Sequence, residues 1–208
     1  MSKNGKFYDN VQMDTSAASV EEFDRQGTPN TGAYDANVIS DAVAKVFDTS
    51  GAGILVTHSQ GGGPGWLTAI KTDKVKGIVA FEPGSGFVFP EGEVPAPIEN
   101  SAPFGALAGE AIPLQDFMKL TKIPIVIYYG DHIATTPITD WNEDSWRARL
   151  AMARLWADTI NRHGGNAKVV HLPEIGIYGN THFPFADKNN IDIANLMEQW
   201  LHEQKLDI

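Results

Sequence analysis

Four short apolar runs place the strongest constraint on the fold of this chain. They cover residues 53–57, 77–81, 123–129 and 168–172, and turn-forming residues bound each of them. The runs do not alternate apolar with polar residues, which is typical of strands that are covered on both faces of a parallel sheet. The sequence therefore predicts a mostly parallel sheet of about four strands with flanking helices.

Segments of helical periodicity separate several of these runs. Apolar residues recur at helical spacing over 34–48, from about Gly65 onward, over 140–163 and over 190–203. Such spacing predicts amphipathic helices, and Gly51 follows the first of them as a stop signal. Strands that alternate with helices indicate an α/β fold with right-handed crossovers.

Two segments do not follow this alternation. Residues 1–33 are polar and poorly periodic, so we expect a polar loop or the remnant of a cap, with residues 34–208 forming the α/β domain. Residues 83–120 are rich in proline, glycine and phenylalanine. An irregular insertion of this length in an α/β domain favours a lid or a pocket wall over a loop packed on the surface.

Composition excludes several classes of protein. Of the 208 residues 42% are hydrophobic, enough to bury a core, and the net charge of -10 would repel a phosphate backbone, so no nucleic-acid partner is expected. No apolar run approaches the ~20 residues of a membrane span, so no membrane partner is expected either. The chain has no cysteine, which excludes disulfides and thiolate catalysis. No signal peptide is visible, and the compartment stays open.

The strongest chemical signal is a serine between a predicted strand and a glycine run. Ser59 follows the apolar run 54–56, and Gly61 lies two residues after it. This context matches the nucleophile elbow G-x-S-x-G, although Thr57 replaces the first glycine. The backbone N–H of Gln60, at the start of the following helix, is a candidate oxyanion donor. An ordinary turn serine is the alternative interpretation.

A serine nucleophile needs a base and an acid that orients it. Of the six histidines, His182 follows the last predicted strand in a glycine-bearing loop, where the base falls in the chain order Ser, acid, His. Two acids compete. Asp131 follows the third predicted strand, which is the usual position, whereas Glu82 ends the second strand, where open α/β sheets form crevices. A surface or capping carboxylate is the alternative for each.

Several segments together resemble the α/β-hydrolase superfamily, and more narrowly a bacterial esterase group typified by esterase 713. They are Thr-His-Ser-Gln-Gly-Gly at 57–62, Phe-Glu-Pro-Gly at 81–84, Tyr-Gly-Asp at 129–131, Gly-Asn-Thr-His at 179–182 and Asp-Lys-Asn-Asn at 187–190. In that group the acid is a Glu after the strand that follows the elbow. The resemblance, which covers about residues 34–205, therefore implies a triad of Ser59, His182 and Glu82, with Asp131 as second choice.

The resemblance implies a serine hydrolase that cleaves carboxylic esters or lactones through an acyl-enzyme, with a small-molecule ester as its partner and without cofactor or metal. Three aromatic residues, Trp66, Phe87 and Phe89, are expected to help wall an apolar substrate pocket.

The chain departs from this family at its beginning. Such enzymes have four further strands before the elbow and an upstream loop that supplies a second oxyanion donor, whereas here only 58 residues precede Ser59. The chain is therefore expected to be the C-terminal part of such an enzyme, with one strand edge exposed. The alternative function is a catalytically impaired fragment or a non-catalytic binding module. An oligomer such as a homodimer would shield the exposed edge.

Overall fold

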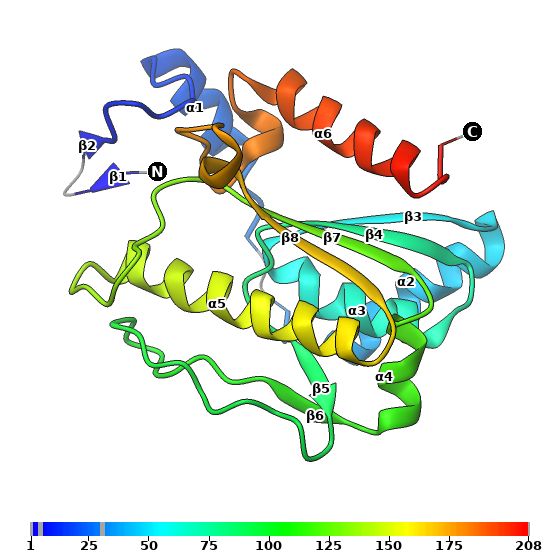
Figure 1. Ribbon diagram of the computed structural model, residues 1–208. Helices are drawn as coiled ribbons and strands as arrows, with labels where there is room; N and C mark the ends of the chain where they lie inside the picture. Colours follow the sequence, from blue (N-terminus) through cyan, green and yellow to red (C-terminus); the bar gives the residue numbers. More distant parts are fainter. Residues whose placement is uncertain (1, 4–5, 30–31, 208) are drawn as a thin grey trace.

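A parallel four-stranded sheet forms the centre of the computed structural model, which describes residues 2–3, 6–29 and 32–207 (Figure 1). Its strands are β3 (Gly53–His58), β4 (Val75–Phe81), β7 (Pro124–Tyr129) and β8 (Asn166–His171), arranged in that order. Val56 pairs with Val79, which pairs in turn with Val126. The four apolar runs thus form one mostly parallel sheet, as the sequence predicted.

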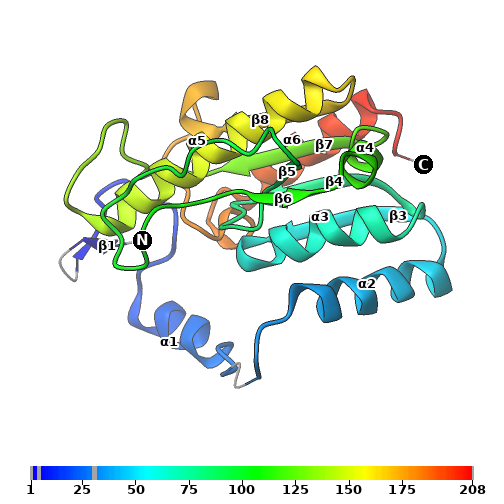
Figure 2. The same cartoon turned by 90° about the horizontal axis from the view of Figure 1, so that it is seen from below.

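Helices cover both faces of this sheet. One face carries α3 (Gly62–Lys71), α4 (Leu114–Leu120) and α5 (Trp141–Arg162), with α2 (Ala36–Ser50) beside α3 (Figure 2). The other face carries α6 (Asn190–Glu203). The helices predicted over 34–48, 140–163 and 190–203 are thus confirmed to within two residues at each end.

Successive residues of each strand point into two separate cores. Ile78 and Ala80 of β4 pack toward α3 and α5, whereas Val79 and Phe81 pack with Ile193 on the α6 side. All four β4 residues are at most 5% exposed. Because both faces of the strand are covered, the sequence shows a continuous apolar run where a one-sided sheet would show alternation.

Residues 82–113 lie on the α5 side of the sheet. They contain a short parallel pair of strands, β5 (Val88–Pro90) and β6 (Glu110–Ile112). The long loop between the two strands is closed by an isolated antiparallel β-bridge between Ile98 and Leu107. The indole Nε1 of Trp156 on α5 donates to Val88 O at 2.7 Å and fastens β5 to the core.

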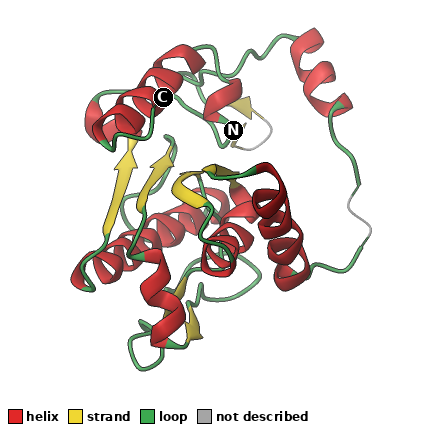
Figure 3. Ribbon diagram, turned by 90° about the vertical axis from the view of Figure 1, so that its right-hand side faces the viewer, coloured by secondary structure: helices red, strands yellow, loops and turns green. Residues whose placement is uncertain are grey.

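The N-terminal segment lies on the α6 side of the sheet (Figure 3). It contains β1 (Ser2–Lys3), β2 (Lys6–Phe7) and a nine-residue helix, α1 (Ala17–Arg25), which Ser16 caps. Gln12 N–H donates to Gly179 O at 2.7 Å, and Lys188 N–H donates to Gln12 O at 2.9 Å. The segment therefore packs on the loop that carries His182. No helix in the described part of the chain is long and apolar enough to cross a membrane.

Candidate active site

Ser59 lies on a tight turn between β3 and α3. Its backbone has φ +53°, a left-handed conformation that is rare for a residue with a side chain. A short 3₁₀ turn (Ser59–Gly61) runs directly into α3. The turn packs closely on its surroundings, because a Cβ on Gly62 would lie 2.6 Å from Pro83 Cβ, and one on Gly65 would lie 2.7 Å from Thr57 Cγ2. The predicted strand–Ser–glycine–helix arrangement is therefore present.

Ser59, His182 and Glu82 form one hydrogen-bonded line. His182 Nε2 lies 2.8 Å from Ser59 Oγ, and His182 Nδ1 lies 2.6 Å from Glu82 Oε2. Glu82 follows β4 with φ +45° and is 3% exposed. Its second oxygen, Oε1, accepts from Gly130 N–H at 2.6 Å, so backbone and imidazole together fix the carboxylate.

Asp131, the other candidate acid, has different partners. Its Oδ1 accepts from His132 N–H at 2.7 Å, and its Oδ2 accepts from Gly179 N–H at 2.8 Å. Its own N–H donates to Asn180 O at 2.9 Å. Asp131 therefore braces the loop that leads to His182, whereas the ring of His182 is bonded to Glu82.

A buried polar network holds the same loop from its other end. Asp187 is 2% exposed and accepts from Thr181 N–H at 2.7 Å and from Thr181 Oγ1 at 3.0 Å. Asn180 Nδ2 donates to Asp187 Oδ2 at 3.0 Å and to Asn189 Oδ1 at 2.8 Å. Burial raises the pKa of Asp187, and the hydrogen bonds from Thr181 and Asn180 oppose this rise. In the sequence, residues 187–190 stand out only through the resemblance to the esterase group, and that resemblance gave them no role.

His58, the residue before Ser59, also contacts the His182 loop. Its Nε2 donates to the backbone oxygen of His182 at 2.7 Å, and the two rings lie 4.5 Å apart. Burial lowers the pKa of His58, while the bond to His182 O raises it. Within the described residues, no three His, Asp or Glu side chains form a group that could hold a metal ion.

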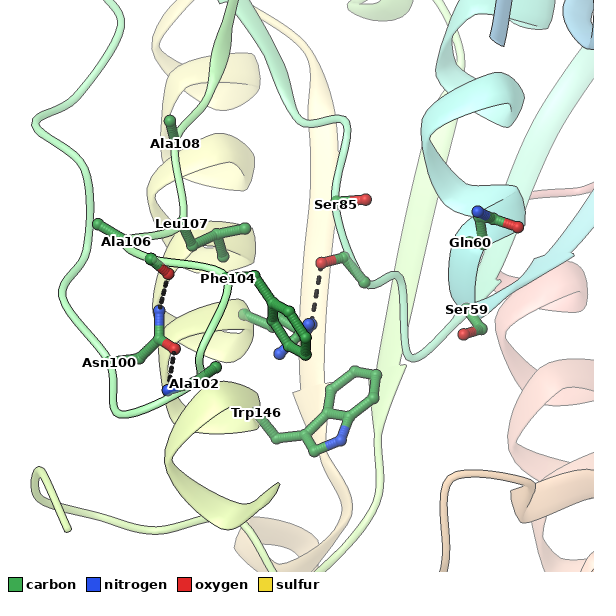
Figure 4. A pocket seen from close by; sticks show the side chains of 13 residues that line it. Ser59, Gln60, Ser85, Asn100, Ala102, Phe104, Ala106, Leu107, Ala108 and Trp146 are labelled. Atoms are coloured by element: carbon green, nitrogen blue, oxygen red, sulfur yellow. Dashed lines mark hydrogen bonds between the residues drawn. The ribbon is translucent and has the colours of Figure 1, made fainter. Parts of the chain in front are cut away.

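A cavity of about 380 Å³ opens beside Ser59 and Gln60 (Figure 4). One wall is the loop between β5 and β6, which contributes Asn100, Ala102 and residues 104–108. Trp146 and Arg149 of α5 also line the cavity, and Ser59 and Gln60 lie across from the loop. Part of the predicted insertion 83–120 therefore lines the cavity at the serine.

The aromatic residues expected to wall the pocket lie elsewhere. Trp66 and Phe87 are 0% exposed and Phe89 is 1% exposed, and all three belong to the core between the sheet and α5. Trp66 packs on Trp156, with ring centroids 4.4 Å apart, because its face of α3 is turned toward α5. The aromatic rings at the cavity are those of Phe104 and Trp146, and Trp146 had no sequence signal beyond its place in a long helix.

Comparison with known proteins supports this description of the fold. No family model matches the chain. The atomic-resolution structure of a novel bacterial esterase superposes with a TM-score of 0.74 at 23% identity, covering 98% of this chain and 54% of the esterase. This chain has the fold of an esterase. The fold class predicted from the sequence is thereby confirmed.

A curated relative is similar in sequence. The chain is 26% identical over 193 residues to the probable secreted lipase phiG of Fungal sp. (strain ATCC 74256), a match that covers 78% of this chain and 49% of the lipase. The chain therefore spans about half the length of both proteins.

Proposed function

We propose that this protein is a serine hydrolase that cleaves carboxylic esters or lactones through a Ser59–His182–Glu82 triad. The observation that carries the proposal is the hydrogen-bonded line from Ser59 Oγ through both ring nitrogens of His182 to Glu82. The names of the two similar proteins, an esterase and a lipase, support ester substrates.

The protonation pattern of this line suits a general base. An ionised carboxylate only accepts hydrogen bonds, so His182 Nδ1 carries the proton that Glu82 Oε2 accepts. His182 Nε2 is then free of hydrogen and accepts from Ser59 Oγ–H. Ser59 is thereby poised to lose its proton to His182 as it attacks a carbonyl carbon.

Hydrolysis then proceeds in two halves. Ser59 Oγ adds to the ester carbonyl, and the imidazolium of His182 returns its proton to the departing alkoxide, which leaves as the alcohol. A water molecule, deprotonated by His182, next attacks the acyl-Ser59 ester. The bond to Ser59 Oγ breaks, His182 returns the proton to Oγ, and the acid is released. Glu82 stabilises the imidazolium in both halves and holds the ring in the required tautomer.

The turn at Ser59 supports the same assignment. A left-handed serine between a strand and a helix is the geometry of a nucleophile elbow. The N-terminus of α3 directs backbone N–H groups and a positive dipole end toward this turn. Gln60 lines the cavity directly after Ser59, so its N–H is the proposed oxyanion donor.

A catalytically impaired fragment or a binding module is the second candidate function. β3 lies at the end of the strand order, and its Val56 is 49% exposed. An apolar groove of about 530 Å³ runs beside it, lined by residues of β3 and α6. An exposed apolar surface of this kind is typical of a docking site.

Labelling with a fluorophosphonate probe separates the two candidates. We expect the probe to modify Ser59, with the adduct located by peptide mass spectrometry, and short-chain 4-nitrophenyl esters to be hydrolysed. Ser59→Ala should abolish both, whereas Ser50→Ala, on the exposed end of α2, should change neither. Absence of labelling in protein that unfolds cooperatively would favour the non-catalytic candidate.

A further inference from the structure

The cavity beside Ser59 contains a single charged side chain. Of the 13 residues that line it, all within the described chain, Arg149 alone is ionisable. The remaining polar groups of the wall come from serine, asparagine and glutamine. The charge of Arg149 is therefore the dominant electrostatic feature that a substrate would meet there.

Arg149 differs from the other arginines of α5. Arg147 pairs with Asp144 at 2.5 Å, Arg154 with Glu174 at 2.5 Å, and Arg162 with Glu93 at 3.6 Å. Among the described residues, no carboxylate lies within ion-pair distance of Arg149. In a chain with 26 acidic residues, the arginine that has no carboxylate partner among the described residues is the one that lines the cavity.

The contacts of Arg149 orient its guanidinium without neutralising it. Its Nε donates to Gly84 O at 3.0 Å, and its guanidinium carbon lies 4.7 Å from the centroid of the Trp146 ring. Neither terminal nitrogen has a hydrogen-bond acceptor within the part of the chain described. Two parallel N–H donors therefore stay available for one carboxylate, which is the geometry that a guanidinium fork favours.

Burial makes this unpaired charge costly. It lowers the pKa of Arg149, and electrostatic interactions with Tyr129 and Glu82 only partly oppose the effect. A half-buried cation is stabilised when an anion reaches it. A ligand carboxylate would supply the partner that the protein itself does not.

Gly84 connects Arg149 with the proposed nucleophile. Its N–H donates to Ser59 O at 3.1 Å, and its carbonyl accepts from Arg149 Nε. One residue thus bridges the backbone of Ser59 and the guanidinium, and both line the same cavity. A molecule of modest size can reach both groups at once.

We propose that Arg149 binds a carboxylate of the substrate, so that the preferred substrates are esters that carry a negative charge beside the scissile bond. This inference rests on the proposed function. The reaction stays a hydrolysis: water is added, the ester C–O bond breaks, and an alcohol and an acid are released. The carboxylate on Arg149 is held and not altered.

Two matched pairs of esters test the proposal and show on which side of the ester the charge lies. The first pair is 4-acetoxybenzoate and its methyl ester, with the carboxylate in the alcohol part. The second is mono(4-nitrophenyl) adipate and methyl 4-nitrophenyl adipate, with the carboxylate in the acyl part. We expect the wild-type protein to show a higher kcat/KM for the anionic member of at least one pair.

Substitution of Arg149 should remove this preference. Because the hydrogen bonds from Arg149 to a carboxylate would be lost, Arg149→Gln should lower the anionic-to-neutral ratio of kcat/KM by about ten- to hundredfold, mainly through KM. Arg149→Lys should keep part of the ratio, since the charge stays but the fork is lost. The matched control is Arg154→Gln on the same helix, whose partner Glu174 lies outside the cavity. That change should leave the ratio as it is.

Two results would overturn the inference. One is a wild-type protein without preference in either pair. The other is an Arg149→Gln variant that loses activity equally on both members, which would assign Arg149 a purely structural role at Gly84.

A binding measurement separates failure of this inference from failure of the proposed function. In Ser59→Ala protein, calorimetry should detect binding of the monomethylamide of adipic acid, and the added Arg149→Gln change should abolish it. Binding without any esterolysis or Ser59 labelling would retain the carboxylate site and refute the hydrolase. Esterolysis without binding of the monomethylamide and without a preference for anionic esters would retain the hydrolase and refute the carboxylate site.

Discussion

His58 Nε2 donates a hydrogen bond of 2.7 Å to the backbone oxygen of His182. The residue that precedes the proposed nucleophile thus fixes the backbone of the proposed base from β3. Phe183 and Phe185 also pack on the His58 ring, with centroids 4.8 and 5.0 Å away. We therefore expect His58 to act as a positioning residue, because it holds the backbone of the proposed base without contacting Ser59 Oγ or Glu82 itself.

Removing the donor of His58 should slow catalysis. His58→Leu keeps the apolar packing but leaves His182 O without this bond, so we expect kcat on 4-nitrophenyl acetate to fall about tenfold, the value for roughly 1.4 kcal/mol, with little change in KM. His58→Gln places an amide donor near the Nε2 position and should restore part of kcat. Equal kcat values for the two variants would contradict a role for the hydrogen bond.

His58 should also make stability depend on pH. Burial lowers its pKa below the usual value of about 6.5, so the unfolded chain binds the proton more readily. The stabilisation is present above that usual value and is lost as the pH falls through the lowered pKa. We expect the unfolding free energy of the wild-type protein to fall more steeply below about pH 6.5 than that of His58→Gln. Urea titrations between pH 5 and 8 measure this difference, and parallel curves would refute it.

The two candidate acids should behave differently when each is made neutral. Glu82→Gln presents an amide to His182 Nδ1 and favours the wrong tautomer, and the corresponding change in a Ser-His-Asp protease lowers kcat about 10⁴-fold. We expect a loss of similar order here. Asp131→Asn should cost activity far less and should lower the melting temperature instead, because Asp131 accepts two loop N–H groups. The opposite ranking of kcat would assign the acid to Asp131.

The sequence predicted the sheet well because its two central strands, β4 and β7, are buried on both faces. The runs around Ile78 and Val126 stay apolar through consecutive positions, and only a doubly covered strand requires that. Ser59 and His182 could also be predicted as candidate site residues, since each stands in a recognisable local context of strand, turn and glycine.

Pocket residues were much harder to predict than the strands. Trp66 and Trp146 both lie on helices, and only the packing of α3 against α5 turns the first into the core and leaves the second at the cavity. The choice between Glu82 and Asp131 likewise depends on which loop carries a side chain to His182. α1 was missed because its nine residues are mostly polar, and its apolar Val20 and Phe23 are too few to show a period.

Asp187 should be required for a stable His182 loop. Asp187→Asn would turn an amide N–H₂ toward donors on Thr181 or Asn180, leaving buried N–H groups without acceptors. We expect a loss of about 1–3 kcal/mol in the free energy of unfolding, together with a lower kcat. Asp192→Asn, on the exposed first turn of α6, is the matched control and should change stability by no more than about 0.5 kcal/mol. Equal stabilities of the two variants would show that the network contributes nothing.

Two adjacent glycines should respond differently to alanine. A Cβ on Gly62 would lie 2.6 Å from Pro83 Cβ, so Gly62→Ala must push the turn at Ser59 away from the residue after Glu82. Forced overpacking of this kind costs about 1–3 kcal/mol. Gly61 has φ -65°, and its Cβ would meet nothing closer than Thr57 Cβ at 4.0 Å. Gly61→Ala should therefore be neutral or slightly stabilising, because it restricts the unfolded chain.

Chemical denaturation of the two variants measures this contrast. Because the clash at Gly62 should shift Ser59 relative to Glu82, the alanine variant should also label more slowly with a fluorophosphonate, since Ser59 Oγ would no longer sit 2.8 Å from His182 Nε2. A Gly62→Ala protein as stable as Gly61→Ala would mean that the turn has room to move. The close packing of the turn against Pro83 would then not be what holds Ser59 in its left-handed conformation.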